Sequence, residues 1–552
     1  MAAMSPRDSV TQGREALRSG DALAARSAFG AAEASGAALE GMSAASYVLL
    51  EFPRAIDEME RAHAAYRSEA DGAGAVRSAR TLGYLHGTTG GDWAIAGGWI
   101  ARAKTLLVDQ PDSSERGWVA LTEGMFEGDR RIKERHYADA LDAGRSRRDP
   151  ELVFCSLAYL GASLVHGDHV EEGMVLLDEA LAAVAGGEVD DFIVVEEIFC
   201  QMFSACERAQ DVGRAEQWIR VGEVIAERRR LPAVTAYCRT HYGGILTAAG
   251  RWREADDALT EAVRLWALGR RTLTAGALVR LADLRVKQGR LEDAERLLDG
   301  MGNNPEATLP WASLRLARGE SAVARETVER ALQGTDPRSS SVVPFLALLT
   351  DIHLADGDLA SASTSVDALA ACAEGHPSPY STAVLALARG RIALATGTGD
   401  PRESLRDALA GFTSAQLPLE AALCRLDLAR AFAQQSPQVA VAEARAALAE
   451  FERLTAARQV DIAQSLLRRL GARVSPARSG STLTRREKDV LTLLGEGHSN
   501  REIAERLFIS RKTVEHHVGH VLDKLGLRNR SEAAAYAVRS SAPEQDAPHA
   551  GK

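Results

Sequence analysis

The most informative stretch of this sequence lies at residues 483–540, which read LTRREKDVLTLLGEGHSNREIAERLFISRKTVEHHVGHVLDKLGLRNRSEAAAYAVRS. At three points a capping side chain stands three residues before a glutamate, an arrangement that satisfies free N–H groups at the start of a helix. These pairs are Thr484 and Glu487, Ser499 and Glu502, and Asn529 and Glu532. Ser510 offers a further N-cap, and Gly497 and Gly526 stand where helices commonly end. The pattern predicts four short helices, over 485–495, 500–507, 511–525 and 532–539.

The third of these helices has two distinct faces. Its apolar residues recur at intervals of three and four and should pack on the two helices before it, at Ile503, Ala504, Val490, Leu491 and Leu494. These apolar residues are Val514, Val518, Val521, Leu522 and Leu525. The opposite face carries Arg511, Lys512, Glu515, His516, Gly519 and Asp523. Because the second helix of a helix-turn-helix lies in the major groove of DNA, this outward face is the candidate DNA-reading surface.

The individual residues of the stretch also indicate a family. The chain resembles the LuxR (GerE)-type DNA-binding domain of bacterial transcription factors over about sixty residues without a gap, about a tenth of its length. The matching motifs are Leu483-Thr484-x-Arg486-Glu487-x-x-Val490-Leu491, Gly497-x-Ser499-Asn500-x-Glu502-Ile503-Ala504, Ser510-x-Lys512-Thr513-Val514-x-x-His517, Lys524-Leu525-Gly526 and Arg528-Asn529-Arg530-x-Glu532-Ala533. The resemblance implies a four-helix domain that binds double-stranded DNA as a homodimer.

The resemblance also implies roles for single residues. The positions that face bases in such domains are Glu515, His516 and Gly519, and those that contact or approach backbone phosphate are Asn500, Lys512, Thr513 and His517. The dimer contact falls on the last helix, residues 531–538, at Ala533, Ala534 and Ala537.

Two of the base-facing positions depart from members of the family that carry lysine there. Glu515 can accept a hydrogen bond from a cytosine amino group, but its charge repels phosphates. Gly519 has no side chain and costs the helix about 1 kcal/mol relative to alanine. The base specificity of a relative therefore does not carry over to this chain.

The charge distribution favours DNA as the partner of this region. Residues 481–540 hold eleven Arg and Lys against eight Asp and Glu, whereas the whole chain has a net charge of −10. An acidic chain with a basic end should bind DNA through that end and avoid indiscriminate adhesion to nucleic acid. The alternative is that the charged helix face is only solvated, or that the helix-turn-helix docks a protein partner.

Composition predicts the rest of the architecture. The 552 residues are 46% apolar but only 5% aromatic, and they are rich in alanine, which favours stacked helices over a large sheet. Long apolar runs and a secretory leader are not evident, so a cytoplasmic protein is expected. The six cysteines form no CxxC pair and are expected to be scattered reduced thiols in the core.

A weak repeat covers residues 10–470, with a helix, a turn and a second helix that is rich in alanine. The turns are Gly20-Asp21, Gly91-Asp92, Gly128-Asp129, Gly167-Asp168, Gln210-Asp211, Gly250-Arg251, Gly289-Arg290, Gly319-Glu320, Gly357-Asp358 and Gly399-Asp400. The units resemble tetratricopeptide repeats with a longer period and predict ten or eleven hairpins. Stacked hairpins bury the face that each leaves open and form a solenoid.

The sequence thus predicts an all-α protein, a helical-hairpin (tetratricopeptide-like) solenoid followed by a small helix-turn-helix domain. The expected segments are a repeat array at 1–470, a flexible linker at 471–482, the DNA-binding domain at 483–540 and a disordered tail at 541–552. The array should bind an effector, which is a peptide, a protein or a small molecule, and RNA polymerase is a further candidate partner.

Catalysis, cofactors and metals have little support in the sequence. The phosphate-binding pattern GxxxxGK[ST] is absent, and the first 120 residues read as helices and not as the alternating strands and helices of a receiver domain. His166, Asp168 and His169 occupy a repeat turn, where a metal site is not expected. The rivals to a DNA-binding regulator are an interaction scaffold and an enzyme hidden in the repeats.

Overall fold

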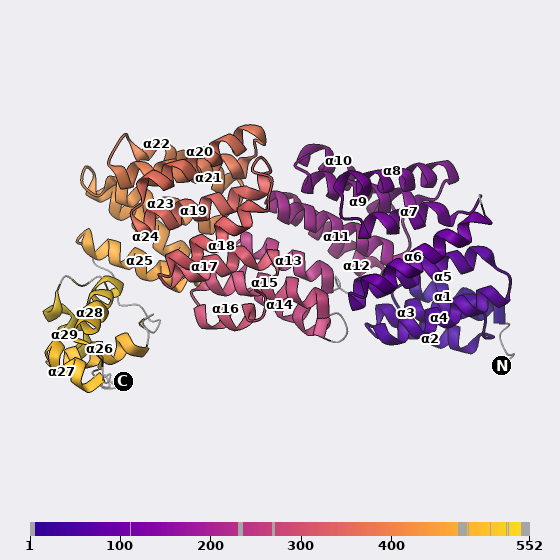
Figure 1. The fold of residues 1–552 in the computed structure, drawn as a ribbon, viewed down its shortest axis with the longest axis horizontal. Coiled ribbons are helices and arrows are strands. Elements are labelled where there is room, and N and C mark those ends of the chain that lie inside the picture. Colours follow the sequence, from indigo (N-terminus) through magenta and orange to yellow (C-terminus); the bar gives the residue numbers. More distant parts are fainter. Residues whose placement is uncertain are drawn as a thin grey trace, which may run out of the picture. The chain divides into compact units, whose positions relative to one another are not determined.

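The structure of the chain is a computed structural model. It describes residues 6–110, 112–229, 236–267, 271–472, 483, 485–507, 509–525, 527 and 529–541. Helices and the turns between them make up this part of the chain, and it contains no strand (Figure 1). The prediction of an all-α fold is confirmed.

The helices fall into two compact units, which are residues 1–286, 290–382 and 414–417, and residues 287–289, 383–413 and 418–552. The first twelve helices are α1 (Pro6–Arg18), α2 (Ala22–Ala31), α3 (Gly36–Val48), α4 (Phe52–Ser68), α5 (Gly72–Leu85), α6 (Trp93–Val108), α7 (Glu115–Phe126), α8 (Arg130–Arg147), α9 (Pro150–His166), α10 (Val170–Gly186), α11 (Phe192–Ala209) and α12 (Val212–Arg229).

The next thirteen are α13 (Ala236–Ala248), α14 (Trp252–Ala267), α15 (Arg271–Gln288), α16 (Leu291–Leu298), α17 (Thr308–Ala317), α18 (Ser321–Gln333), α19 (Val343–Asp356), α20 (Leu359–Gly375), α21 (Pro379–Thr396), α22 (Pro401–Ser414), α23 (Pro418–Phe432), α24 (Pro437–Leu454) and α25 (Ala457–Arg469). Short helical turns occur at η1 (His86–Gly90), η2 (Pro305–Ala307) and η3 (Ser340–Val342). We call α1 to α25 the array.

Consecutive helices of the array pair as hairpins. Within the described residues there are twelve such hairpins followed by the single helix α25, which is more than the ten or eleven predicted. The two hairpins without a predicted turn are α3–α4 and α23–α24, whose turns contain no glycine. The first of them turns at Leu50, which has a φ of 62°.

The turns that the repeat pattern predicted are present. All ten of the predicted turns lie between consecutive helical elements, and seven of their glycines have positive φ, where glycine carries no steric penalty. At the turn between α9 and α10, Gly167 keeps a negative φ, and Asp168 takes the left-handed conformation instead.

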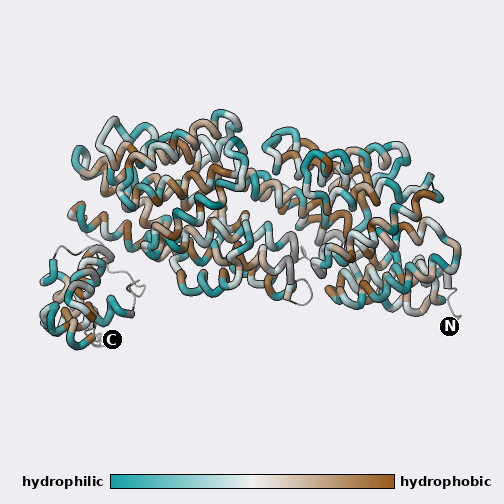
Figure 2. Tube along the Cα trace, in the orientation of Figure 1, coloured by the Kyte–Doolittle hydropathy of each residue, from teal (hydrophilic) through white to brown (hydrophobic). Residues whose placement is uncertain are grey.

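Small residues let the helices of the array pack closely. In the N-terminal core, alanines such as Ala55, Ala79 and Ala103 are fully buried beside Leu82 and Tyr66. Figure 2 shows hydrophobic residues spread along the array and the head, in the helices whose buried faces form these cores. Because each hairpin covers the apolar face of its neighbour, the stability of the array is distributed along its length.

Two helix backbones approach each other closely within the hairpin of α9 and α10. A Cβ atom added at Gly161 would stand 2.7 Å from the carbonyl oxygen of Gly173, and one added at Gly173 would stand 2.3 Å from that of Gly161. Both distances are shorter than real Cβ atoms show, so any side chain at either position would force the two helices apart.

The cysteine expectation holds in part. Cys155, Cys206, Cys372 and Cys424 are buried free thiols, as predicted. Cys200 differs, because it forms a disulfide, and its partner sulfur lies outside the described side chains. Cys200, Cys206 and Cys238 could be expected to meet on adjacent helices, but the irregular spacing of the cysteines does not predict a disulfide.

Among the described helices, none is both long enough and apolar enough to cross a bilayer.

Candidate nucleic-acid interface

The C-terminal helices match the prediction closely. They are α26 (Arg485–Gly495), α27 (Asn500–Leu507), α28 (Arg511–Leu525) and α29 (Arg530–Ser541). The first three have the predicted bounds, and α29 begins two residues earlier and ends two residues later than predicted. We call these four helices the head.

The core of the head contains the residues that the helical spacing predicted. Val514, Val518 and Val521 of α28 are buried in one cluster with Ile503 and Ala504 of α27, Val490, Leu491 and Leu494 of α26, and Ala533 and Ala537 of α29. Leu522 and Leu525 are partly buried against it. This packing leaves the opposite face of α28 uncovered within the head.

The helix caps hold α27 and α28 in place. The Ser499 N–H and Oγ both donate to Glu502 Oε2 at 2.7 Å, and the Glu502 N–H donates back to Ser499 Oγ at 3.4 Å. The hydrogen bonds from Ser499 lower the pKa of the Glu502 carboxyl below its ordinary value. Ser510 Oγ accepts from the Thr513 N–H at 3.1 Å and so caps α28.

The remaining predicted caps are only partly within the described residues. Asn529 Oδ1 accepts from the Glu532 N–H at 3.0 Å, and Gly497 ends α26 with a φ of 88°. Thr484 and Gly526 lie outside the described residues.

The outward face of α28 holds the positions predicted to face bases. Glu515 is exposed and pairs with Arg511, one turn earlier, with 3.3 Å between Glu515 Oε1 and Arg511 Nε. A Cβ atom added at Gly519 would have no neighbour within 4 Å, so packing in the head does not require glycine there. The side chains of His516 and Lys512 lie outside those described, although both positions belong to α28.

The predicted phosphate contacts stand in different surroundings. Asn500 begins α27, and its Oδ1 accepts a hydrogen bond from Arg530 Nη1 at 2.6 Å. Thr513 Oγ1 shares a hydrogen bond of 2.7 Å with Ser510 Oγ, so this hydroxyl takes part in the cap of α28. His517 is half-buried.

The structure changes the expectation for the dimer helix. Ala533 and Ala537 of α29 are buried in the core of the head, with 0% and 5% of their surface exposed. Their side chains face α26 and α28, and of the three predicted contact residues only Ala534 keeps appreciable surface. The exposed part of α29 next to it includes Ser531 and Ala535.

Two arginine contacts in the head were not predicted from the sequence. Arg530 joins α29 to the start of α27, because it also donates to the carbonyl oxygen of His498. Arg511 neutralises Glu515 in part. The spacing of Arg511 and Glu515 could have indicated their pairing, but the partners of Arg530 lie thirty residues away and leave no local signal.

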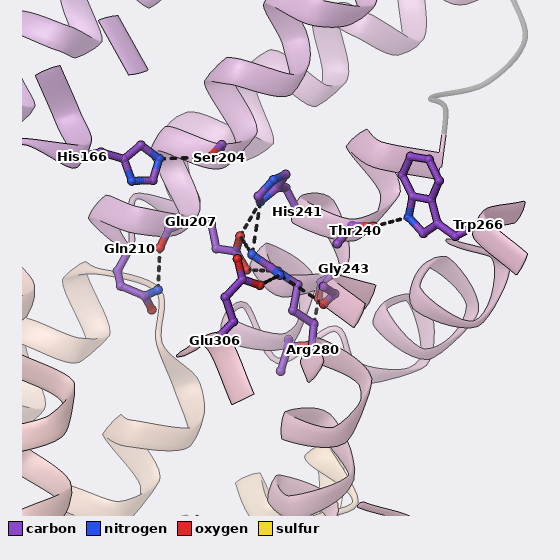
Figure 3. Close-up of polar contacts among 12 residues, drawn as sticks. His166, Ser204, Glu207, Gln210, Thr240, His241, Gly243, Trp266, Arg280 and Glu306 are labelled. Atoms are coloured by element: carbon purple, nitrogen blue, oxygen red, sulfur yellow. Dashed lines mark hydrogen bonds and ion pairs between the residues drawn. The ribbon is translucent and has the colours of Figure 1, made fainter. Parts of the chain in front are cut away.

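A second group of polar side chains lies in the array and links α9, α11, α13 and α15 (Figure 3). Arg280 Nε and Nη2 donate to the two carboxylate oxygens of Glu207 at 2.6 and 2.8 Å, and Arg280 Nη1 donates to Glu306 at 3.0 Å. His241 Nδ1 stands 2.6 Å from Glu207 Oε2. Beside them, His166 Nε2 stands 3.1 Å from Ser204 Oγ.

The electrostatics of this group follow from its burial. Burial raises the pKa of Glu207, but the charge of Arg280 and the hydrogen bonds from His241 and Arg280 outweigh it and bring the pKa to about 2. The pKa of His166, which is exposed at the surface, is lowered to about 4 by partial desolvation and by the charge of Arg208. At neutral pH Glu207 is therefore ionised and His166 neutral.

The three residues of the repeat turn after α9, which are His166, Asp168 and His169, contact other side chains. Asp168 accepts from Arg208 Nη2 at 3.1 Å and from the Ser340 N–H at 3.1 Å, which ties the turn after α9 to η3. His169 stands 3.9 Å from Glu172. His166 and Asp168 thus have separate contacts with neighbouring helices and turns.

Comparison with known proteins concerns the head. Residues 481–537 match the family described as bacterial regulatory proteins, luxR family. This part is 58% identical over 57 residues to the uncharacterized transcriptional regulatory protein YhcZ of Bacillus subtilis, covering 10% of this chain and 27% of that protein. It is 47% identical over 57 residues to the oxygen regulatory protein NreC of Staphylococcus aureus, covering 10% of this chain and 26% of that protein.

A longer match of 73 residues joins this chain to Mb0914c of Mycobacterium bovis, which is named as an HTH-type transcriptional regulator, at 47% identity. It covers 13% of this chain and 8% of that protein. The matched parts thus span from 8% to 27% of the length of these relatives.

One solved structure aligns along most of the chain, the crystal structure of the APC/C hetero-tetramer Cut9-Hcn1. The alignment covers 92% of this chain and 97% of that chain, with 13% sequence identity and a TM-score of 0.40.

Proposed function

Because the head is a LuxR-type helix-turn-helix domain, we propose that this chain is a DNA-binding transcriptional regulator whose α28 enters the major groove. The observation that carries the proposal is the exposed face of α28. The opposite face packs into the core of the head, and N-caps at Ser499 and Ser510 hold α27 and α28 in place. Such a face meets base edges with its central residues and phosphates with its N-terminal residues.

In this proposal the phosphate contacts come from the start of α27 and α28. Asn500 is oriented by Arg530, because an amide whose oxygen accepts from a guanidinium leaves its NH₂ group to donate elsewhere. Lys512 adds a cation in the first turn of α28. Base reading falls to Glu515 and His516, with Gly519 leaving room for a base or a water.

The dimer is the second part of the proposal. Two heads would meet through the exposed side of α29, near Ala534 and Ala535, since Ala533 and Ala537 are used by the core of each head. A symmetric dimer would bind a site with two-fold symmetry, with half-sites spaced by about one helical turn of DNA.

The array is the third part. We infer that its helix faces hold an effector and that binding there controls the head, which then acts on transcription in the cytoplasm through contact with RNA polymerase or exclusion of it. Helical hairpin arrays present long surfaces of this kind. No catalytic step and no cofactor form part of the proposal.

The test is selection of duplexes from a random pool by the full chain, followed by sedimentation of the complex. The proposal expects one enriched motif with inverted symmetry and two chains per duplex. Lys512→Ala should lose the enrichment, whereas Lys488→Ala, which removes an exposed lysine of the same charge from α26, should retain it. A head that docks a protein would enrich no motif, and both variants would behave like the parent.

A further inference from the structure

Two part-buried arginines of the first unit are paired with carboxylates. Arg77 of α5 donates from Nε to Glu40 at 2.7 Å and from Nη1 to Glu115 of α7 at 3.2 Å. Arg280 of α15 is held by Glu207 and Glu306, as described above. A guanidinium group that loses part of its hydration is normally compensated in this way.

Arg80, which lies one turn after Arg77 on α5, does not follow this pattern. Within the part of the chain that the structure describes, its guanidinium group has neither a hydrogen-bond nor an ion-pair partner, and its Nε is fully buried. The residue as a whole is only half-buried, so the Nη atoms are the accessible end of the group. Its five N–H donors are thus left without a partner among the residues that the structure describes.

The surroundings of Arg80 hold the group in place. Its Cζ lies 5.5 Å from the ring centroid of Trp118 of α7, and Trp118 Nε1 donates to Asp149 Oδ2 at 3.0 Å, which fixes the ring. Burial lowers the pKa of Arg80, and the charges of Glu115 and Glu40 act against that shift. Both carboxylates are already engaged by Arg77, so they do not neutralise Arg80 by direct contact.

We propose that Arg80 and Trp118 form a binding site for a small monocarboxylate with an apolar body. The carboxylate would accept two hydrogen bonds from the Nη atoms of Arg80, the geometry in which arginine binds carboxylates best. The apolar body would lie along the Trp118 ring. The site goes beyond the proposed function, because it concerns the array and makes no use of DNA.

The charge of the site favours one negative charge over two. Arg77 and Arg80 together balance Glu40 and Glu115, so a monoanion adds a single charge to a neutral group, whereas a phosphate dianion would add two beside two carboxylates. This balance favours a monoanion, and the planar fork of Arg80 favours a carboxylate among monoanions.

Beyond Arg80, two tyrosines hold the carboxylate of Glu197. Tyr84 follows Arg80 by one turn on α5, and its hydroxyl donates to Glu197 Oε1 at 2.5 Å. Tyr159 of α9 donates to Glu197 Oε2 at 2.5 Å. Glu197 is therefore saturated by two phenols, and its charge is partly screened from a bound anion.

The test is calorimetric titration of the full chain with sodium benzoate, the simplest carboxylate with a flat apolar body. Benzamide, which has the same shape without the charge, is the ligand control. The inference expects saturable binding of one benzoate per chain and no saturable binding of benzamide. Arg80→Met should weaken benzoate binding by at least about tenfold, because both charge-assisted hydrogen bonds are lost.

Two further variants make the result decisive. Arg102→Met removes a guanidinium on α6 that also has no ion pair among the described residues and contacts neither Arg80 nor Trp118, so it should bind benzoate like the parent. Arg80→Lys keeps the positive charge but removes the planar guanidinium group. This variant should bind benzoate several-fold more weakly and unfold at the same temperature as the parent protein. Absence of saturable benzoate binding, or equal binding by the parent and both Arg80 variants, would overturn the inference.

Discussion

Arg530 Nη1 donates a hydrogen bond to Asn500 Oδ1 at 2.6 Å, so a residue at the start of α29 fixes the amide of a residue at the start of α27. Arg530 also donates to the carbonyl oxygen of His498, in the turn before α27. The helix proposed for the dimer contact is therefore connected directly to a residue proposed to bind phosphate.

This relationship predicts that Arg530 and Asn500 act as a unit in DNA binding. Arg530→Met should weaken DNA binding about as much as Asn500→Ala, and the double variant should be little worse than either, with a coupling energy of about 0.5–3 kcal/mol. Fluorescence anisotropy of a labelled duplex with the full-length variants measures all three. If the two single losses of DNA-binding free energy add up to the loss in the double variant, the two residues act independently.

The pair between Arg511 and Glu515 makes a prediction about specificity. Glu515→Ala removes a negative charge from the DNA-facing side of α28 and frees Arg511 for phosphate. Affinity for random duplex should rise, and the slope of log K against log salt should steepen by about 1. Discrimination between the selected motif and random duplex should fall.

The chain offers a matched control for that variant. Arg501 and Glu505 form the same kind of pair on α27, with 3.3 Å between Arg501 Nε and Glu505 Oε1. Glu505→Ala should change the salt slope less and leave base discrimination intact. Equal effects of the two variants would mean that Glu515 acts only through net charge and does not read a base.

The capping box of α27 predicts a local loss of stability. Ser499→Ala removes the hydroxyl that bonds both the Glu502 N–H and its carboxylate, so α27 should lose about 1 kcal/mol of stability. Hydrogen exchange followed by mass spectrometry should show faster exchange over 500–507. Ser531→Ala, an exposed serine of α29, is the matched control and should leave exchange in α27 unchanged.

The same cap should depend on pH. Hydrogen bonds with Ser499 lower the pKa of Glu502 in the folded state. The stability that the cap contributes is therefore complete above the ordinary pKa of glutamate and is lost as pH falls through the lowered pKa. The difference between the parent and Ser499→Ala should shrink at acid pH. A difference that is constant from pH 7 to pH 3 would contradict this origin.

The part-buried carboxylate of Glu207 predicts a larger effect in the array. Glu207→Gln leaves Arg280 with a neutral partner in place of the carboxylate. Because the two side chains keep 17% and 20% of their surface exposed, the loss of stability should stay below the about 3–5 kcal/mol that a fully buried pair costs. Thermal unfolding at pH 7 should show a clearly lower midpoint. Glu306→Gln, which changes an exposed partner of the same arginine, should lower it far less.

The pKa of Glu207 sets the sign of the pH dependence. Because the folded pKa is about 2, below that of an unfolded glutamate, the stabilisation is fully present above the unfolded value and is lost as pH falls toward 2. The parent should therefore lose stability over this acid range more steeply than Glu207→Gln. Parallel pH profiles for the two proteins would contradict the assignment.

Local patterns in the sequence were sufficient for the head. The bounds of α26, α27 and α28 follow from capping residues and from the three- and four-residue spacing of apolar side chains, because these features act within one or two turns of a helix. The spacing likewise identified which side of α28 is buried. The repeat turns were found where glycine supplies a positive φ.

Contacts between distant residues could not be obtained in the same way. The turns at Leu50, Gln416 and Thr455 take positive φ without glycine, since packing of the flanking helices compensates a cost that local propensity would avoid. The burial of Ala533 and Ala537 depends on how α29 crosses α26, which one helical period does not reveal. The bonds of Arg530 and the unpaired state of Arg80 likewise arise from segments that meet only in the folded chain.

The central claim is that α28 reads specific sites in double-stranded DNA. Recovery of bound DNA across the genome from cells that contain the full chain tests it most directly, with Lys512→Ala as the loss variant and Lys488→Ala as the charge-matched control. The account predicts a limited set of sites that share an inverted-repeat motif, lost with Lys512→Ala and retained with Lys488→Ala. Recovery of the same fragments by all three proteins, without a shared motif, would contradict it.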